Sequence, residues 1–290
     1  MKFSIITPSF RNSSWLKLCI ASIADQSGVT FEHIVQDSCS DDDTQNWLPH
    51  DTRVKAFIEK DSGMYDAVNR GFRRAQGDIL AYLNCDEQYL PGALKTVGDF
   101  FDANPNVEAV FSDTIVTDAD GNYICHRPSL VPGKASMWGR FPILTCGVFI
   151  RRSVARERGI LFDTKWRDLG DFFWVRELVL RGVRMAVLPE LTSIFADTGD
   201  NMNLKANALR ERAEKWRMTP RWIKLLHPYW VLQWRARLAL RAGVRRSPFD
   251  YSIYTMASPS RRVIFPAAQP TTFWKGRLKL NPLAASSDKR

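Results

Sequence analysis

Polar side chains that could bind a cation and a phosphate follow an apolar run near residue 80. Residues 79–83 have the length and composition of a buried strand, and Asn84, Cys85, Asp86 and Glu87 come directly after them. Open α/β sheets bind ligands at such strand ends, and carboxylate oxygens are Mg²⁺ ligands that can bridge to substrate phosphates. Two adjacent carboxylates repel each other unless a cation or solvent compensates. Acidic residues after a strand also serve as polar caps, so this segment alone leaves both interpretations open.

A sheet must bring such side chains together, and the first third of the chain alternates between strand and helix patterns. We predict strands at residues 3–7, 31–36, 54–59 and 79–84 and helices at 13–26, 40–47, 64–75 and 91–103. This alternation indicates an α/β fold with a mainly parallel sheet covered by helices on both faces. The loops after parallel strands share one edge of the sheet, so Pro8, Asp37, Asp61 and Asp86 should converge there.

The pattern becomes less regular after residue 103. We predict strands at 107–112 and 145–151, a hairpin turn at 118–122 and a loop at 128–141. A short helix at 152–158, a helix at 171–180 and a last strand at 185–188 complete this part.

Composition excludes several classes of protein. No apolar run approaches the ~18 residues that span a bilayer, and residues 1–8 read as a first strand, too short and too soon interrupted for a signal peptide. The five cysteines are an odd number without a C-x-x-C pair, which indicates a reducing compartment and argues against a disulfide framework or a zinc cluster. The four histidines show no metal-ligand spacing.

Charge divides the chain into an acidic body and a basic tail. Residues 205–290 hold 19 Lys and Arg against 4 Asp and Glu, whereas the rest holds 22 against 27. We therefore expect two parts, 1–204 and 205–290, and an anionic partner for the second. Tryptophans and arginines mix over 221–241, which is typical of an amphipathic helix on an anionic membrane and equally of a helix packed on the body. The expected membrane-binding segment is 205–245. Nucleic acid is disfavoured because no recognition motif accompanies the aromatic residues. Residues 284–290 have the composition of a disordered end.

Three segments together resemble glycosyltransferase family 2, whose members use nucleotide sugars and have the GT-A fold. They are Ser4-Ile5-Ile6-Thr7-Pro8-Ser9-Phe10-Arg11, the segment 33–42 around Asp37, and the segment 61–71, which is similar to the variant of colanic-acid and exopolysaccharide transferases. The resemblance covers about residues 2–195 and implies a GT-A domain at 1–204 with a basic helical C-terminal extension.

The resemblance implies a nucleotide site and a metal site. The implied nucleotide-binding residues are Thr7, Pro8, Ser9, Phe10, Asp37, Asp61, Ser62, Gly63, Asp66, Asn69, Asn84 and Cys85. Asn84-Cys85-Asp86 stands where the family has D-x-D, so the first acid is replaced by an amide. Asp86 is then the main ligand of a divalent cation, Mn²⁺ or Mg²⁺, with Glu87 as a helper.

The resemblance also implies a catalytic base. Residues 168–178 are similar to the family segment that carries it, and this assigns the base to Asp171, with Asp168 as the second choice. Without the resemblance, Asp171 is better explained as an acid at the start of a helix, stabilised by the helix dipole.

These residues imply an inverting transferase that moves a sugar from a nucleoside-diphosphate sugar, expected to be a UDP-sugar, to an acceptor hydroxyl. The expected acceptor is a carbohydrate or a lipid-linked sugar of surface-polysaccharide or glycolipid assembly, and the expected location is the cytoplasm, on the inner face of the plasma membrane. Asn84 favours one alternative, a non-catalytic nucleotide-sugar-binding homologue or interaction protein with a basic membrane- or nucleic-acid-binding tail. A nucleotidyltransferase is disfavoured because the first loop lacks glycines.

Overall fold

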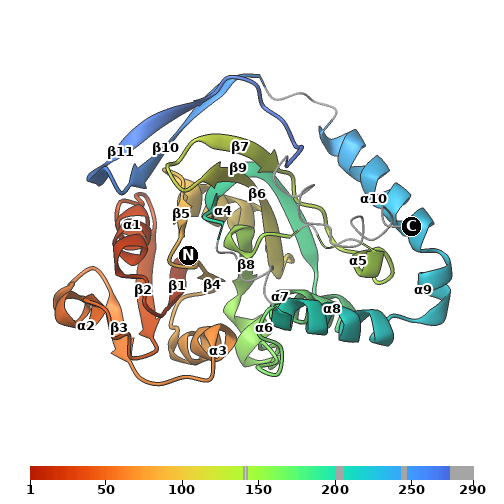
Figure 1. Ribbon diagram of the computed structural model, residues 1–290, viewed down its shortest axis with the longest axis horizontal. Helices are drawn as coiled ribbons and strands as arrows, with labels where there is room; N and C mark the ends of the chain where they lie inside the picture. The colour runs from red at the N-terminus through yellow and green to blue at the C-terminus, as the bar shows by residue number, and fades with distance from the viewer. Residues whose placement is uncertain (140, 142, 200–205, 243–246, 275–290) are drawn as a thin grey trace, which may run out of the picture.

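The computed structural model describes the chain except residues 140, 142, 200–205, 243–246 and 275–290. Its centre is a mixed sheet in the order β3-β2-β1-β4-β8-β6-β9-β5, with β7 paired to β6 (Figure 1). The strands are β1 (Lys2–Ser9), β2 (Thr30–Asp37), β3 (Lys55–Ile58), β4 (Ile79–Tyr82), β5 (Glu87–Tyr89), β6 (Ala109–Asp118), β7 (Tyr123–Arg127), β8 (Val148–Arg151) and β9 (Met185–Asp197). Strands β3, β2, β1 and β4 are parallel, which confirms the mainly parallel first half of the sheet.

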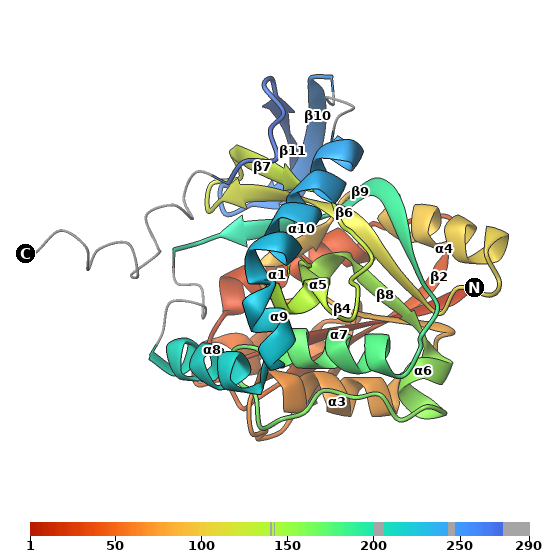
Figure 2. The ribbon, with the colours of Figure 1, turned by 90° about the vertical axis from the view of Figure 1, so that its right-hand side faces the viewer.

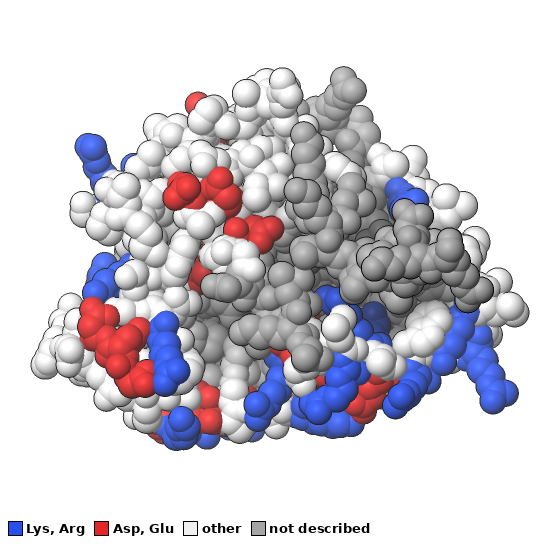
Figure 3. Space-filling view, in the orientation of Figure 1, with Lys and Arg blue, Asp and Glu red and all other residues white. Residues whose placement is uncertain are grey.

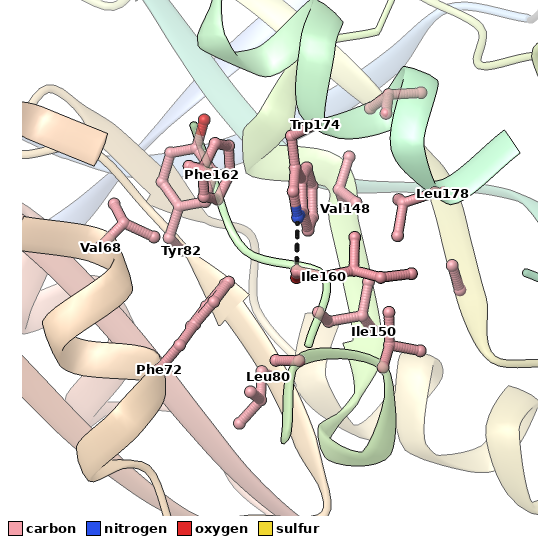
Figure 4. Close-up of a cluster of buried hydrophobic side chains, with 14 of the residues drawn as sticks. Val68, Phe72, Leu80, Tyr82, Val148, Ile150, Ile160, Phe162, Trp174 and Leu178 are labelled. Atoms are coloured by element: carbon pink, nitrogen blue, oxygen red, sulfur yellow. Dashed lines mark hydrogen bonds between the residues drawn. The ribbon is translucent and has the colours of Figure 1, made fainter. Parts of the chain in front are cut away.

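Helices cover both faces of this sheet because its central strands are apolar on both sides. Ile5 and Ile6 are neighbours in β1 and both are fully buried. Ile5 lies in the cluster with α1 (Ser13–Ala24) and α4 (Ala93–Ala103), and Ile6 in the cluster with α3 (Met64–Arg74) and α7 (Gly170–Leu180). In the second cluster Phe162 stacks on Trp174 at 4.5 Å and Tyr82 meets Phe162 edge-on (Figure 4). The helices of the body are α1 (Ser13–Ala24), α2 (Thr44–Trp47), α3 (Met64–Arg74), α4 (Ala93–Ala103), α5 (Ser136–Gly139), α6 (Arg152–Arg156) and α7 (Gly170–Leu180).

Several helices and strands differ in extent from those predicted, in part because pairing with distant strands determines where they begin and end. Glu87–Tyr89 forms β5 and pairs with β9, so α4 begins at Ala93 and Pro91 does not open it. Strand β9 is 13 residues long, although only residues 185–188 were predicted, because it continues beside β6 past a register shift. The predicted loop at 128–141 contains the short helix α5, and the predicted strand at 145–151 begins with a 3-10 turn at Thr145–Gly147.

The C-terminal part is not purely helical, contrary to the prediction. Helices α8 (Ala206–Met218), α9 (Arg221–Leu225) and α10 (His227–Ala242) run from the side of α7 past α5, and a hairpin of β10 (Phe249–Thr255) and β11 (Ser258–Ala267) lies over α1 and β7 (Figures 1 and 2). Strand β9 is therefore not the last strand. The sequence shows the hairpin as alternating Phe249, Tyr251 and Ile253, which pack against the body.

Polar contacts also join the C-terminal part to the body. Arg241 of α10 forms an ion pair of 2.7 Å with the buried Asp113, and Arg262 of β11 binds Asp25 at 2.6 Å. The division at residue 204 stays a prediction, and residues 284–290 lie outside the described part of the chain.

Candidate active site at the strand ends

The loops after β1, β2, β3 and β4 meet at one edge of the sheet. The backbone N–H of Ser38 donates to the carbonyl of Ser9 at 2.9 Å, and the thiol of Cys85 donates to the carbonyl of Pro8 at 3.1 Å. The N–H of Asp61 reaches the hydroxyl of Ser38 at 3.4 Å. This confirms that the strand-end loops converge.

Asp37 holds the turn that follows β2. Its side chain is fully buried, and its two carboxylate oxygens accept from the N–H of Ser40 at 2.8 Å and from the hydroxyl of Ser40 at 2.6 Å. This is the capping role that a carboxylate at the end of a strand commonly has. Contact between Asp37 and a nucleotide base stays a prediction.

Two residues of the predicted nucleotide site form buried hydrogen bonds to other parts of the protein. The hydroxyl of Thr7 is buried and pairs with Nε2 of His33 at 2.9 Å. Asn69 is buried, and its amide both donates to and accepts from the backbone of Phe162 at 2.9 Å. We therefore revise Thr7 and Asn69 to structural residues. Phe10, by contrast, is 49% exposed at the end of β1, where a nucleoside could contact its ring.

The turn between β3 and α3 is stabilised by its own polar groups. Asp61 accepts from the N–H of Gly63 at 2.9 Å, and Asp66 accepts from the N–H of Ser62 at 3.1 Å and pairs with Arg70 at 2.9 Å. Gly63 has a φ of 132°, which side-chain-bearing residues rarely adopt. The turn borders a cavity of about 180 Å³, lined by Ser62, Gly63, Met64, Tyr65, Asp66, Thr164, Trp166 and Arg167.

The 84–87 loop carries two acids in different surroundings. Asp86 lines a small hollow formed with Trp15, the turn after β6 and the tip of the C-terminal hairpin. Glu87 is 1% exposed and accepts from the N–H of Asn84 at 2.8 Å. Burial raises the pKa of both carboxyl groups, and the charge of Asp86 raises that of Glu87 further.

Asn84 and Asp86 are the candidate ligands of a divalent cation in this loop. Asn84 Oδ1 is buried and has no hydrogen-bond partner within the described part of the chain, and Asp86, two residues later, borders the hollow. Glu87 is buried and its Oε2 already accepts from the N–H of Asn84, so it supports the loop, and its role as a helper ligand stays a prediction. The described residues contain no group of three or more His, Cys, Asp or Glu suited to a metal, so substrate phosphates would have to complete the coordination, as is common for Mg²⁺.

Asp171 lies in the first turn of α7, among two tyrosines and a lysine. Its backbone N–H donates to the hydroxyl of Tyr65 at 3.1 Å, and its Oδ1 accepts from the N–H of Phe172 at 2.7 Å. Burial raises the pKa of Tyr65 and Tyr82, and the charge of Asp171 raises both further. A carboxylate here could accept a proton from a bound hydroxyl.

Asp168 is bound into a network and is less suited to be a base. Its carboxylate accepts from the side-chain amide of Asn207, and its N–H donates to Glu211 at 3.0 Å. Asp171 and Asp168 thus lie in the same short segment with different partners, and the choice of Asp171 as the base stays a prediction.

Sequence analysis missed two residues of α8 that lie at this site. Glu211 binds the segment before α7, and Lys215, one turn later, places its Nζ 4.0 Å from the centre of the Phe172 ring. Burial lowers the pKa of Lys215 to about 8, although the charge of Asp171 acts in the opposite direction. One feature of the sequence could have drawn attention to Glu211: it is one of only four acidic residues in the otherwise basic segment 205–290.

Comparison with known proteins agrees with this arrangement. A family model described as Glycosyl transferase family 2 matches residues 4–159. A GalNAc(5)-diNAcBac-PP-undecaprenol beta-1,3-glucosyltransferase of Campylobacter jejuni is 33% identical over 127 residues, which are 42% of this chain and only 40% of that protein's length. Uncharacterized protein MT1568 of Mycobacterium tuberculosis is 25% identical over 82% of this chain and 88% of its own length.

Solved structures show the same fold. S. aureus TarS 1-349 in complex with UDP-GlcNAc has a TM-score of 0.62 at 17% identity, over 76% of this chain and 65% of that chain. Mannosyltransferase PcManGT from Pyrobaculum calidifontis, in complex with GDP-Man and Mn²⁺, has a TM-score of 0.55 at 18% identity, over 84% of this chain and 76% of that chain. These matches confirm the predicted GT-A fold.

Proposed function

Because the chain belongs to glycosyltransferase family 2, we propose that it moves a sugar from a nucleoside-diphosphate sugar to an acceptor hydroxyl and inverts the anomeric centre. The observation that carries this proposal is the convergence of the loops after β1 to β4, where the thiol of Cys85 binds the carbonyl of Pro8 and the N–H of Ser38 binds the carbonyl of Ser9. Asp171 is joined to the start of α3, directly after the turn that follows β3, because its N–H donates to the hydroxyl of Tyr65 at 3.1 Å. The candidate base and the acidic 84–87 loop are thus both connected to the strand-end loops, as expected of a site that binds a diphosphate and activates a hydroxyl.

In the proposed reaction Asp171 accepts the proton of the acceptor hydroxyl. The acceptor oxygen forms a bond to the anomeric carbon, the bond from that carbon to the diphosphate oxygen breaks, and the nucleoside diphosphate leaves with the electron pair. Asn84 and Asp86 are the residues that would hold a divalent cation, which would offset the charge of the leaving diphosphate.

We propose a UDP-sugar as the donor and a lipid-linked or free carbohydrate as the acceptor. The donor proposal is supported by the TarS complex, whose ligand is UDP-GlcNAc, although that likeness extends to the fold alone. The acceptor proposal is supported by the Campylobacter relative, whose name gives an undecaprenol-linked substrate. Phe10 and the loops after β1 to β4 are the proposed nucleotide contacts.

The experiment that tests the proposal is a thermal-shift panel of UDP, UDP-GlcNAc, GDP-mannose and the matching diphosphates, with and without Mn²⁺. We expect stabilisation by at least one donor and, for that donor, slow release of nucleoside diphosphate when water replaces the acceptor. A protein that is stabilised by a nucleotide sugar but releases no diphosphate, with water or with a lipid extract as acceptor, would be the non-catalytic homologue that the amide of Asn84 favours. No shift with any nucleotide would reject both.

We also propose that helices α9 and α10 contact an anionic membrane, on the inner face of the plasma membrane. Their exposed apolar side chains include Leu225 at 81%, Leu232 at 66% and Leu240 at 84% exposure, and Lys and Arg side chains gather around α8 and α9 (Figure 3). Each cation near anionic lipid can add about 1 kcal/mol. None of the described helices is long and apolar enough to cross a bilayer.

Sedimentation with phosphatidylglycerol and phosphatidylcholine vesicles tests the membrane contact. We expect binding to the anionic vesicles alone and a clear loss of binding in Leu225→Ser. Ile264→Ser is the matched control, because Ile264 is 69% exposed on β11, away from these helices. Equal sedimentation of wild type and Leu225→Ser with the anionic vesicles would show that this surface does not contact the membrane.

A further inference from the structure

Glu211 of α8 is a buried carboxylate that binds three consecutive backbone N–H groups. Its Oε1 accepts from Arg167 at 2.8 Å, and its Oε2 accepts from Asp168 at 3.0 Å and from Leu169 at 2.8 Å. Only 3% of the residue is exposed. Burial raises the pKa of Glu211, but the backbone N–H groups and Asn207 outweigh this and leave the pKa below its ordinary value, so the group is an anion at neutral pH.

These three residues lead directly into the helix that carries the candidate base. Leu169 is the N-cap of α7 and makes no side-chain cap bond, and Asp171 lies in the first turn. Of the three N–H groups, that of Leu169 belongs to the end of the helix, where N–H groups lack acceptors within the helix and an anion is stabilised by the helix dipole. Glu211 therefore sets both the path of the loop and the position at which α7 begins.

A second contact between the same elements strengthens this one. The side-chain amide of Asn207 donates to Glu211 at 3.0 Å and also to the carboxylate of Asp168. Lys215 follows Glu211 by one helical turn and so lies on the same side of α8, over the ring of Phe172. The helix that anchors the loop thus also places a lysine over Phe172, the residue after Asp171.

We infer that Glu211 is a positioning residue for the proposed reaction: its bonds to residues 167–169 hold Asp171 in the place from which it takes the proton. The inference rests on the proposed function and extends the site beyond residues 4–159, the part that the family model matches, to helix α8. A shift of about 1 Å in a reacting group can cost roughly 100-fold in rate. Because Asp171 lies in the first turn of α7, a displaced start of this helix should lower turnover.

The test compares Glu211→Gln with Glu214→Gln in the full chain. Glu214 lies on the same helix and also reaches the loop, through an ion pair of 2.8 Å with Lys165, but this pair is at the surface. Turnover is measured as diphosphate release from the donor that gives the largest thermal shift, and donor-binding sites are counted by calorimetry. We expect Glu211→Gln to lose about 10- to 100-fold in turnover per donor-binding site with donor affinity unchanged, and Glu214→Gln to match wild type.

Counting the binding sites separates positioning from folding. A purely structural role would lower the number of folded sites and leave the turnover of each site as in wild type, which would overturn the inference. Should Glu211→Gln not fold, Asn207→Ala is the second variant: it removes the amide that bridges Asp168 and Glu211 but leaves the three backbone bonds of Glu211. It should show a smaller loss in the same direction, and wild-type turnover per site in this variant would overturn the inference. Asp171→Asn measured in parallel separates the two proposals: if it is active, the proposed base is wrong; if it is inactive while Glu211→Gln is active, only the positioning role fails.

Discussion

Replacing Asp171 with Asn removes a proton acceptor and one negative charge while the shape of the side chain is kept. The amide oxygen can still accept from the N–H of Phe172, now at 2.7 Å, and the backbone N–H of residue 171 still donates to Tyr65. We therefore expect Asp171→Asn to fold and to bind the donor with unchanged affinity, since the 84–87 loop is not altered. Transfer should be lost, because an amide cannot accept the proton.

The surroundings of Asp171 and Asp168 determine how much the turnover of their two Asn variants should differ. Loss of a general base costs about 10²- to 10⁴-fold in rate, which corresponds to about 3–5 kcal/mol on the activation barrier. The carboxylate of Asp168 already accepts from Asn207, and the amide oxygen of Asp168→Asn can still accept there without the charge, so we expect a loss of at most about 1 kcal/mol, or about fivefold in rate. The two variants should therefore differ in turnover by at least about 20-fold.

The assay follows release of the nucleoside diphosphate under donor saturation, with donor affinity measured separately by calorimetry. A change confined to turnover identifies an interaction made in the transition state. Near-wild-type turnover of Asp171→Asn would refute the assignment of the base. A larger loss in Asp168→Asn than in Asp171→Asn would show that the two roles are reversed.

Three further predictions concern the cation, the packing at the start of α7 and the pH dependence of folding. Asp86→Ala should abolish most of the gain in donor affinity that Mn²⁺ provides, and calorimetry showing the same gain as in wild type would contradict the ligand role. Gly170→Ala should lower the free energy of unfolding by about 1–3 kcal/mol in urea titrations, because the added Cβ would lie 2.3 Å from the ring of Tyr65, and an unchanged midpoint would contradict this contact. Burial raises the pKa of Glu32, but bonds from Lys55, Ser4 and the N–H of residue 76 outweigh this and lower it from 4.5 to about 2. Because the folded state holds this carboxylate ionised, its contribution of about 2 kcal/mol to the free energy of unfolding is present above pH 4.5 and is lost as the pH falls toward 2. The difference in free energy of unfolding between wild type and Glu32→Gln should therefore shrink over that range. A difference that stays constant would show that the pKa of Glu32 is not lowered in the folded state.

The parallel half of the fold could be predicted because its signals are local. Strand β1 is apolar on both sides, as Ile5 and Ile6 show, and the polar loops that follow the first four strands end each apolar run sharply. Parallel strands joined by helices place these loops on one edge, so the convergence of the strand ends follows from order alone. The elements that were missed or shortened, β5, the second half of β9 and the hairpin, depend on partners more than 100 residues away or on very short runs.

The candidate site was predictable in outline and less so in the role of each side chain. The same residue types bind ligands and cap strands, and only their partners separate the two uses. Asp37 is bound by Ser40, Asn69 by Phe162 and Asp168 by Asn207, and none of these pairings follows from spacing. The direction in which Glu87 points depends on the pairing of β5 with β9.

The alternating strands and helices, the edge at which Asp86 lies and the excess of basic residues near the C-terminus all follow from the sequence, because apolar periodicity and charge are properties of short stretches. The return of α8 to the body is visible only in the folded chain, where Glu211 binds the backbone before Asp171 and Lys215 lies on Phe172. These contacts join segments about 40 residues apart, and those of Glu211 are made to backbone N–H groups, which carry no side-chain signature in the sequence.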